Sequence, residues 1–382
     1  MEKEETQIII IAGEASGDRH AAHLVDELKV RRPDIKFSGL GGEKMRSSGV
    51  AIYHDLTRLA VIGFWEVAKH YTALKRIFDD ILKKIDEIKP ACVILVDYPG
   101  FNLRLAKKLK KHGVRVFYYI SPQVWAWKEN RVHQVKKYVE RMFVIFKFEK
   151  DFYARHGIDV SFVGHPLLDT LKVDCPKDEF LKKHGLKDFQ LTIGLLPGSR
   201  EKEITRILPV MLKAAAILKE KYPMLQFLIV KAPTIEHDML TTHVNVEKLG
   251  IRLIDGDTTN AIHACDLCIV ASGTATLETA LLQKPMVIVY KTSWITWAIA
   301  KLFVKIPDIG LVNVVAGKRI VPECVQHKAN AKAIAVELES IFKDETKIAA
   351  IKSELAQLKR NLDLGGASGR AADEILIRLG LI

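Results

Sequence analysis

The chain has 382 residues, of which 48% are hydrophobic, and a formal net charge of +12. This length exceeds what one core usually holds and predicts two domains. The positive charge favours anionic partners, namely phosphorylated substrates, nucleic acid or an acidic lipid surface, without choosing among them. The acidic start (MEKEE) is unlike a signal peptide, and no apolar run reaches the roughly 18 residues of a spanning helix. Five scattered cysteines argue against a disulfide framework, so we expect a cytoplasmic chain that is soluble or peripheral to a membrane.

Short apolar runs alternate with longer amphipathic stretches, which is typical of α/β folds with parallel strands. A helix over 21–31 is expected after the first strand, and a basic amphipathic helix near 72–88 precedes the second. A break rich in Gly and Pro at 164–178 separates two such series, so the sequence predicts two doubly wound domains. The predicted strands are 7–12, 91–96, 114–120 and 141–146 before the break, and 191–196, 225–230, 251–254, 266–271 and 285–290 after it.

Two polar motifs directly follow predicted strands in the first half, where ligands of parallel sheets collect. In 13–18 (GEASGD) the glycines permit a sharp turn close to a ligand, and Ser16 or Asp18 could cap the next helix. An ordinary turn explains this motif equally well. In 97–102 (DYPGFN), Asp97 stands at the tip of a buried strand, where desolvation would raise its proton affinity and suit a general base. A helix-capping aspartate is the competing interpretation.

A third motif in the first half is aromatic and basic. Residues 121–127 (SPQVWAW) follow a strand and lead to Lys128 and Arg131. Core packing readily explains one tryptophan, whereas two tryptophans beside two cations suggest a wall for a sugar or an acyl chain.

Two motifs in the second half are suited to a diphosphate. In 196–201 (LPGSRE), glycine and serine expose backbone N–H groups, and Arg200 can pair with phosphate oxygens. In 272–278 (SGTATLE), small residues open a helix whose N-terminus favours phosphate, and Glu278 follows within reach of a ribose diol. An exposed turn arginine and a plain helix cap are the alternatives. The two motifs support each other because they follow strands of the same half.

Three further patterns are better explained as structural, and no metal site is predicted. Residues 255–257 (DGD) have the spacing of metal-dependent sugar transferases, but they follow a short strand and suit a turn and helix cap. Cys265 and Cys268 have no second pair nearby and suit small buried side chains. His165 has no acidic partner identifiable from the sequence.

Two segments have the character of interfacial helices on an anionic membrane, 61–67 (VIGFWEV) and 294–306 (WITWAIAKLFVKI). Each taken singly is somewhat better explained by an amphipathic core helix, and the two together with the net charge favour the membrane. The residues expected to face lipid are Phe64, Trp65, Trp294, Trp297, Lys301 and Phe303.

The motifs GEASGD, DYPGFN, SPQVWAWKENR, GHPLLD, LPGSR and SGTATLE occur in one order and together resemble the lipid-A-disaccharide synthase family. The resemblance runs from about residue 7 to beyond 325. It implies the glycosyltransferase B fold, with two Rossmann-like domains facing a cleft: an acceptor and membrane domain over 1–170 and a UDP-sugar domain over 171–366. A helix over 367–382 would pack back on the first domain.

The resemblance also implies the reaction and its residues. A UDP-diacylglucosamine donor would react with a diacylglucosamine 1-phosphate acceptor, with inversion, no metal and no other cofactor, on the inner face of the inner membrane of a Gram-negative cell. Asp97 would be the base for the acceptor 6-hydroxyl, and Arg200 would neutralise the leaving UDP. The implied substrate-binding residues are Glu14, Ser16, Asp18, Asn102, Trp125, Ser199, Ser272, Gly273, Thr274, Glu278 and Asn313.

Other functions remain as alternatives. A UDP-N-acetylglucosamine 2-epimerase would have the same architecture without an acceptor or membrane contact. A binding protein would keep Arg200 without needing Asp97. A nucleic-acid binder is disfavoured because the positive charge is dispersed and no known module appears. The family pattern is broken at Ala21 and Lys147, where glycine and proline are expected. The oligomeric state, a homodimer included, is open.

Overall fold

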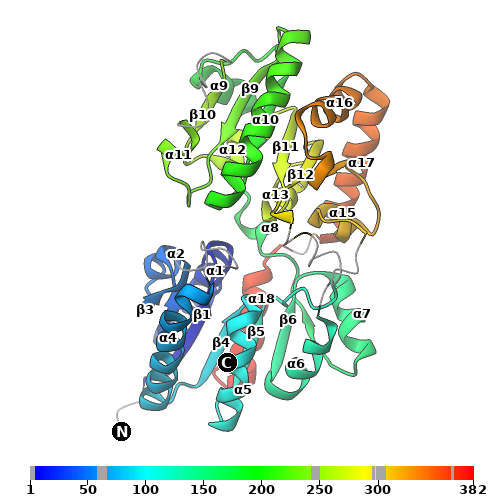
Figure 1. Cartoon of the computed structure of the whole chain (residues 1–382). Coiled ribbons are helices and arrows are strands. Elements are labelled where there is room, and N and C mark those ends of the chain that lie inside the picture. The colour runs from blue at the N-terminus through cyan, green and yellow to red at the C-terminus, as the bar shows by residue number, and fades with distance from the viewer. Residues whose placement is uncertain are drawn as a thin grey trace. The chain divides into compact units, whose positions relative to one another are not determined.

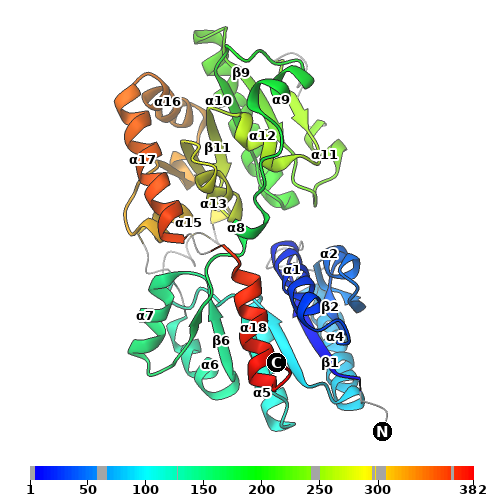
Figure 2. The same cartoon turned by 180° about the vertical axis from the view of Figure 1, so that it is seen from behind.

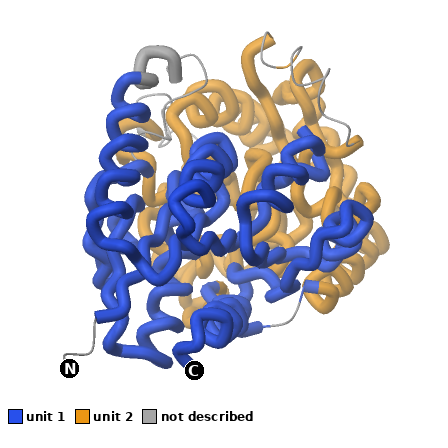
Figure 3. The backbone as a smooth tube through the Cα atoms, turned by 90° about the horizontal axis from the view of Figure 1, so that it is seen from below, with its two compact units in different colours: residues 1–170, 362–382 blue, residues 171–361 orange. Residues whose placement is uncertain are grey.

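The computed structural model describes residues 5–57, 67–126, 128–241, 250–294, 297, 307–362 and 365–382. The chain divides into two compact units, which Figure 3 distinguishes by colour. Unit 1 comprises residues 1–170 together with 362–382, and unit 2 comprises 171–361.

Unit 1 is built on a parallel sheet that has seven strands within the described residues, in the order β3-β2-β1-β4-β5-β6-β7. The central strands are β-branched and apolar, and β1 and β4 are almost completely buried, as expected of a sheet covered on both faces. The strands are β1 (Gln7–Ala12), β2 (Lys36–Gly41), β3 (Ala51–Asp55), β4 (Cys92–Val96), β5 (Val116–Tyr119), β6 (Arg141–Val144) and β7 (Ser161–Phe162).

Helices cover both faces of this sheet. On one face α4, α5 and α6 pack over the sheet, and on the other face α1 and α18 lie side by side (Figures 1 and 2). The apolar side of α4 packs against the sheet through Ile77, Ile81 and Ile85, in the same core cluster as side chains of α5 and α6. The helices are α1 (Ala15–Arg31), α2 (Glu43–Ser47), α4 (Val67–Ile88), α5 (Pro99–Lys111), η1 (Glu129–Arg131), α6 (Val132–Tyr138), α7 (Lys147–Arg155), α8 (Leu167–Thr170) and α18 (Ala367–Leu379).

The C-terminal helix α18 belongs to unit 1, although 191 residues of unit 2 separate it from the rest of that unit in sequence. Asp169 caps its start, because the carboxylate accepts hydrogen bonds from the backbone N–H groups of Gly366 (2.6 Å) and Ser368 (3.2 Å). The buried hydroxyls of Tyr119 and Ser368 are 3.1 Å apart. Unit 1 therefore consists of two chain segments that share one core.

Unit 2 repeats the same plan. Within the described residues its parallel sheet has six strands in the order β10-β9-β8-β11-β12-β13. Helices α10 and α16 pack together on one face, and α9 and α12 pack together on the other (Figures 1 and 2). The strands are β8 (Thr192–Leu196), β9 (Gln226–Val230), β10 (Arg252–Ile254), β11 (Leu267–Ala271), β12 (Met286–Tyr290) and β13 (Glu323–Val325). The helices are α9 (Lys177–Lys183), α10 (Glu201–Lys221), α11 (His237–Thr241), α12 (Thr258–Ala264), α13 (Thr274–Leu281), α15 (Leu311–Ala316), η3 (Gln326–Lys328), α16 (Ala331–Phe342) and α17 (Glu345–Leu362).

The α/β class and the nine predicted strands are confirmed, each to within two residues. Four strands were not predicted, namely β2, β3, β7 and β13, which are short or interrupted by glycine and polar residues. The first helix begins at Ala15 rather than at residue 21, so 15–18 of the GEASGD motif are helical. The helix expected near 72–88 is α4, which begins five residues earlier.

Candidate functional site

The motifs flank the points where the strand order reverses. In unit 1 the strands β1 and β4 are paired at the centre of the sheet. The strands that follow β1 in sequence, β2 and β3, lie on one side of this pair, and those that follow β4 lie on the other side. In unit 2 the neighbours β8 and β11 have the same relationship. Ligands of doubly wound sheets bind at the carboxyl ends of strands at such switch points. The GEASGD and DYPGFN motifs follow one pair of strands, and LPGSR and SGTATLE follow the other.

The first two motifs are in contact in unit 1. The ring of Tyr98 lies against the backbone of Gly13 so closely that a Cβ atom at that position would overlap it. Burial, and then the negative charge of Glu14, raise the pKa of the Tyr98 phenol. Glu14 therefore lies near the ring of Tyr98, which directly follows Asp97 in sequence.

Asp97 stands in a constrained turn between β4 and α5. Asp97 and Tyr98 both have left-handed backbone conformations, with φ angles of 44° and 47°, which non-glycine residues rarely adopt. The Asn102 side-chain amide donates to the carbonyls of Val96 (3.1 Å) and Asp97 (2.8 Å), and the Tyr118 hydroxyl donates to the Asp97 carbonyl at 2.5 Å. The hydrogen bonds and Pro99, the first residue of α5, thus fix the main chain beneath the Asp97 carboxylate.

Asn102 was predicted to contact substrate, and the structure places its side chain in the interior of unit 1. It is fully buried, and both of its amide hydrogen bonds go to the Asp97 turn. Asn102 thus acts on Asp97 through the backbone.

Ser16 and Asp18 do not cap the following helix as predicted, because both lie within α1. Asp18 is 4% exposed, and its carboxylate accepts hydrogen bonds from the backbone N–H groups of Gly42 (2.7 Å) and Lys44 (3.0 Å). It therefore holds the start of α2 against α1. Ser16 is partly exposed and lies two residues after Glu14.

The aromatic motif after β5 is anchored by a residue that the sequence analysis missed. Trp125 donates through its indole N–H to Glu149 Oε1 at 3.2 Å, and Glu149 Oε2 accepts from the backbone N–H groups of Ile145 (3.1 Å) and Phe146 (3.0 Å). Glu149 is 1% exposed, and burial raises its pKa to about 7. Its position three residues after the helix N-cap was the available signal, because a glutamate there often closes a capping box.

His165 is a buried structural histidine, as expected. Its Nδ1 accepts from the backbone N–H of Leu167 at 3.1 Å, and burial lowers its pKa to about 3. Its ring centroid lies 6.2 Å from that of His20, whose pKa burial also lowers.

In unit 2, Arg200 ends the loop that follows β8 and is the N-cap residue of α10. Glu203 folds back onto this loop, where Oε2 accepts from the Ser199 N–H at 3.0 Å and Oε1 lies 3.5 Å from the Arg200 guanidinium. Thr234 donates to the Ser199 carbonyl at 2.7 Å. Burial raises the pKa of Tyr290, and the negative charge of Glu203 raises it further. Tyr290 is the last residue of β12, so the end of this strand lies near Glu203. Glu203 and Tyr290 were not predicted.

The SGTATLE motif forms the start of α13. Gly273 is the N-cap residue and Thr274 the first helical residue, while Glu278 lies partly exposed one turn later. The Ser272 hydroxyl donates to the Ile309 carbonyl at 3.2 Å, which joins the motif to the segment before α15. The predicted residues of this motif thus surround one helix N-terminus.

Asn313, predicted on the nucleotide side, is a buried residue whose side chain connects α15 to the segment 321–323. It is 1% exposed, and its amide donates to the Val321 carbonyl (2.9 Å) and to Glu323 Oε1 (2.8 Å). Glu323 also accepts from the backbone N–H groups of Ile309 and Gly310, both at 2.9 Å. This network positions the carbonyl that Ser272 contacts, and its acidic member was not predicted.

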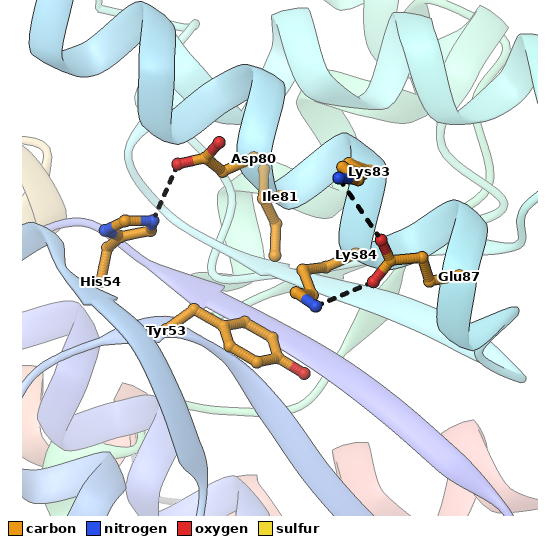
Figure 4. Close-up of a pocket in the computed structure, with 7 residues that line it drawn as sticks. All are labelled: Tyr53, His54, Asp80, Ile81, Lys83, Lys84 and Glu87. Atoms are coloured by element: carbon orange, nitrogen blue, oxygen red, sulfur yellow. Dashed lines mark hydrogen bonds and ion pairs between the residues drawn. The ribbon is translucent and has the colours of Figure 1, made fainter.

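A hollow of about 330 Å³ lies elsewhere on unit 1, between β3 and α4 (Figure 4). Its charged groups pair with one another: His54 Nε2 is 3.2 Å from Asp80 Oδ2, and Lys84 is 2.8 Å from Glu87. Because opposite charges alternate here, the hollow is poorly suited to an anionic substrate. It is lined by Tyr53, His54, Asp80, Ile81, Lys83, Lys84 and Glu87, which are not the predicted site residues.

The remaining predictions concern metal and membrane. Among the described residues, no cluster of His, Cys, Asp or Glu could hold a metal ion, and no helix is long and apolar enough to cross a membrane. Asp255 of the DGD sequence lies 3.1 Å from Lys231, and Asp257 precedes α12. Trp294 is 69% exposed and Trp297 is half-buried. Four predicted lipid-facing residues lie outside the described part of the chain: Phe64, Trp65, Lys301 and Phe303.

Comparison with known proteins decides the family. The family model described as lipid-A-disaccharide synthetase matches residues 8–376. The lipid-A-disaccharide synthase of Syntrophus aciditrophicus is 45% identical over 366 residues, 96% of either chain. That of Geobacter sulfurreducens is 41% identical over 374 residues, 98% of this chain and 97% of its own. The chain belongs to the lipid-A-disaccharide synthase family. It is a glycosyltransferase of lipid A biosynthesis, and the family predicted from the motifs is confirmed.

Solved structures of low sequence identity show the same fold. A UDP-N-acetylglucosamine 2-epimerase from Neisseria meningitidis superimposes with a TM-score of 0.66 at 14% identity, covering 97% of this chain and 100% of its own. A UDP-glucosyltransferase from Polygonum tinctorium gives 0.63 at 13% identity over the full length of both chains. Together with the two Rossmann-like units, these likenesses confirm the glycosyltransferase B fold.

Proposed function

We propose that this member of the family transfers 2,3-diacylglucosamine from its UDP derivative to the 6-hydroxyl of 2,3-diacylglucosamine 1-phosphate. The products are the β-1,6-linked disaccharide 1-phosphate and UDP, with inversion at the anomeric carbon. The observation that carries the proposal is the family match over residues 8–376, since it spans the motifs of both units.

Unit 2 binds the UDP part of the donor in this proposal. Arg200 lies at a strand end beside the start of α10, and Ser272, Gly273 and Thr274 open α13 on the neighbouring strand. A guanidinium and backbone N–H groups stabilise a diphosphate, and they do so most strongly as negative charge grows on the leaving UDP. Glu278 accepts hydrogen bonds from the ribose, and Ser199 contributes to the phosphate loop.

Unit 1 binds the acceptor and supplies the base. The Asp97 carboxylate takes the proton of the 6-hydroxyl as that oxygen attacks the anomeric carbon, while the bond to the UDP oxygen breaks. The rigid turn supports this role, because a base must be held within hydrogen-bond reach of the proton that it removes. Glu14 and Ser16 contact the sugars beside it, and Trp125 lines the acceptor side.

The substrates carry acyl chains, so the enzyme must reach a membrane. We propose that it binds peripherally to the anionic inner face of the inner membrane, through the segments 61–67 and 294–306. The exposure of Trp294 supports this arrangement, because tryptophan favours the interface between water and lipid.

UDP release from UDP-2,3-diacylglucosamine, measured in mixed micelles with and without the acceptor, tests the proposal. Release that requires the acceptor and yields a disaccharide supports the transferase. UDP release without an acceptor contradicts the proposal, and so does the lack of any UDP release by folded protein that binds UDP. A 2-epimerase-like isomerase is then the next hypothesis, because that enzyme class shares the fold. Asp97→Ala should abolish turnover and leave UDP binding intact. Turnover that survives this change would rule out Asp97 as the base.

A further inference from the structure

The loop 120–126, which follows β5 and carries the aromatic motif, begins with a constrained residue. Ile120 has a left-handed backbone conformation with a φ angle of 68°, which is rare for a β-branched residue. Its N–H group donates to the Phe143 carbonyl of the neighbouring strand β6 at 3.1 Å. A conformation of this kind costs about 1–3 kcal/mol and persists where the surrounding structure holds it. The contacts of the loop with its neighbours therefore maintain a strained backbone.

Two residues of α7 hold this loop through polar contacts. Glu149 Oε1 accepts from the indole N–H of Trp125 at 3.2 Å. The Tyr153 hydroxyl lies 2.8 Å from the Ser121 hydroxyl. Glu149 and Tyr153 are four residues apart, so they lie on one face of α7, and both are buried. The loop is thus attached to this face of the helix at two points.

Capping of α7 does not by itself account for Glu149. Its Oε2 atom accepts from both backbone N–H groups at the start of the helix, at 3.1 and 3.0 Å, while Oε1 contacts the indole of Trp125. A glutamine at this position would satisfy the same two N–H groups without burying an ionisable group. The contact with Trp125 is the interaction of Glu149 that capping does not require.

Trp125 and Phe148 form a corner of two aromatic rings. Their centroids are 5.0 Å apart, the ring planes meet at 86°, and both side chains are partly exposed. The buried ring of Phe146 stacks on that of Phe148 at 5.5 Å and supports it. Because Glu149 already accepts from the indole N–H, Trp125 offers a ligand only the apolar surface of its ring. The corner therefore suits an apolar group better than a phosphate or a hydroxyl.

The two rings of the corner follow the carboxyl ends of β5 and β6, at the edge of the sheet where Asp97 follows the adjacent strand β4. Ligands of parallel sheets bind at this edge. We propose that Trp125 and Phe148 bind an apolar part of the acceptor, an acyl chain or the C–H face of its sugar ring, and that Glu149 positions Trp125 for this contact. The inference rests on the proposed function, in which unit 1 binds the acceptor. The strained loop then serves to present Trp125 at the edge of the sheet.

The experiment measures the KM for the acceptor, the KM for the donor and kcat from UDP release in mixed micelles. Trp125→Ala and Phe148→Ala should each raise the KM for the acceptor about tenfold, because a large apolar contact is lost. The KM for the donor and kcat should stay near the wild-type values. Glu374→Gln is the control, because it removes a carboxylate of unit 1 that lies 2.8 Å from Arg141, and it should change none of the three constants.

The role of Glu149 is tested by a double-mutant cycle with Trp125→Phe, which keeps an apolar ring and has no indole N–H. In the wild-type background, Glu149→Gln should raise the KM for the acceptor several-fold, because the amide keeps the cap of α7 and turns an N–H group toward the indole N–H. In the Trp125→Phe background, the same substitution should have no further effect on this KM. A role in folding alone would give equal effects in both backgrounds.

Acceptors with shorter acyl chains distinguish the two apolar contacts. If the corner binds an acyl chain, the effect of Trp125→Ala on the KM for the acceptor should diminish as the chains are shortened. If the corner binds the sugar ring, the effect should be the same for every chain length. Either result supports the corner as part of the acceptor site.

Three outcomes would overturn the proposal. The first is an unchanged KM for the acceptor in Trp125→Ala and Phe148→Ala, with thermal unfolding showing that both variants are folded. The second is a rise in the KM for the donor that equals the rise for the acceptor, which would remove the assignment of the corner to the acceptor. The third is an equal effect of Glu149→Gln in both backgrounds. Failure of the proposed function is distinguishable, because wild-type enzyme would then show no UDP release that depends on the acceptor.

Discussion

The backbone of Gly13 is the surface on which the ring of Tyr98 rests. Tyr98 follows Asp97 in the left-handed turn, so the loop after β1 sets the position of the turn after β4. This contact joins the loop that carries Glu14 to the turn that carries Asp97, across the point where the strand order reverses.

Gly13→Ala should displace the Tyr98 ring, because the added Cβ atom would overlap it. We expect kcat to fall by about a hundredfold, since a shift of about 1 Å at a catalytic group has an effect of that size. Gly100→Ala is the control: it lies in the first turn of α5, where an added Cβ meets no atom within 4 Å. Steady-state rates of the two variants check this, and equal rates would contradict the coupling.

Asn102→Ala removes both amide hydrogen bonds to the carbonyls of Val96 and Asp97. Because the site is fully buried, the free energy of unfolding should fall by about 1–3 kcal/mol. The turn would also lose its support, so kcat should fall while the KM values change little. Denaturant unfolding and steady-state kinetics separate the two effects. A variant that loses stability and keeps wild-type kcat would show that Asn102 does not position Asp97.

The order of strands and motifs could be predicted because apolar runs and turn residues are local in sequence. The strands at 7–12 and 91–96 were predicted for that reason, whereas β3 has no fully buried residue to mark it. The roles of Asn102 and Asp18 could not be predicted, because the direction of a polar side chain depends on tertiary packing. The capping-box position of Glu149 was a local signal, but its hydrogen bond with Trp125 depends on tertiary packing, because Trp125 belongs to a separate segment.

The carboxyl group of Glu149 should make stability depend on pH. Burial raises its pKa to about 7, above the ordinary value of 4.5, so the folded state holds this proton more tightly than the unfolded state does. The free energy of unfolding should therefore fall as pH rises from 4.5 to 7, by at most about 3 kcal/mol from this group. Glu149→Gln cannot titrate and should flatten that slope.

Thermal unfolding of wild type and Glu149→Gln at several pH values between 5 and 8 measures this slope. His20 and His165 contribute the opposite sign, because burial lowers their pKa values, so stability from them decreases as pH falls below 6.5. Both forms contain these histidines, and the difference between the forms isolates Glu149. Parallel curves for the two proteins would show that the carboxyl group is not responsible.

Asp169→Ala should weaken the attachment of α18 to unit 1. The carboxylate accepts from the first backbone N–H groups of the helix, and losing such a cap costs about 1–2 kcal/mol. We expect a lower melting temperature and earlier proteolytic cleavage between residues 362 and 368. Asp159→Ala, which removes an exposed carboxylate paired with Arg141, should change neither. Equal cleavage rates in both variants would contradict the capping role.

Two substitutions of Glu203 should change UDP affinity in opposite directions. Glu203 places a negative charge 3.5 Å from the Arg200 guanidinium and accepts from the Ser199 N–H at 3.0 Å. Glu203→Gln keeps an acceptor for that N–H and removes the charge that opposes an incoming diphosphate, so UDP should bind more tightly. Glu203→Ala removes the acceptor as well and releases the loop, so UDP should bind several-fold more weakly, because ordering the loop then opposes binding. Calorimetric titration of UDP into each variant distinguishes the two effects. If Glu203 acted only through its charge, UDP would bind more tightly to both variants. If it acted only by holding the loop, UDP would bind more weakly to the alanine variant and unchanged to the glutamine variant.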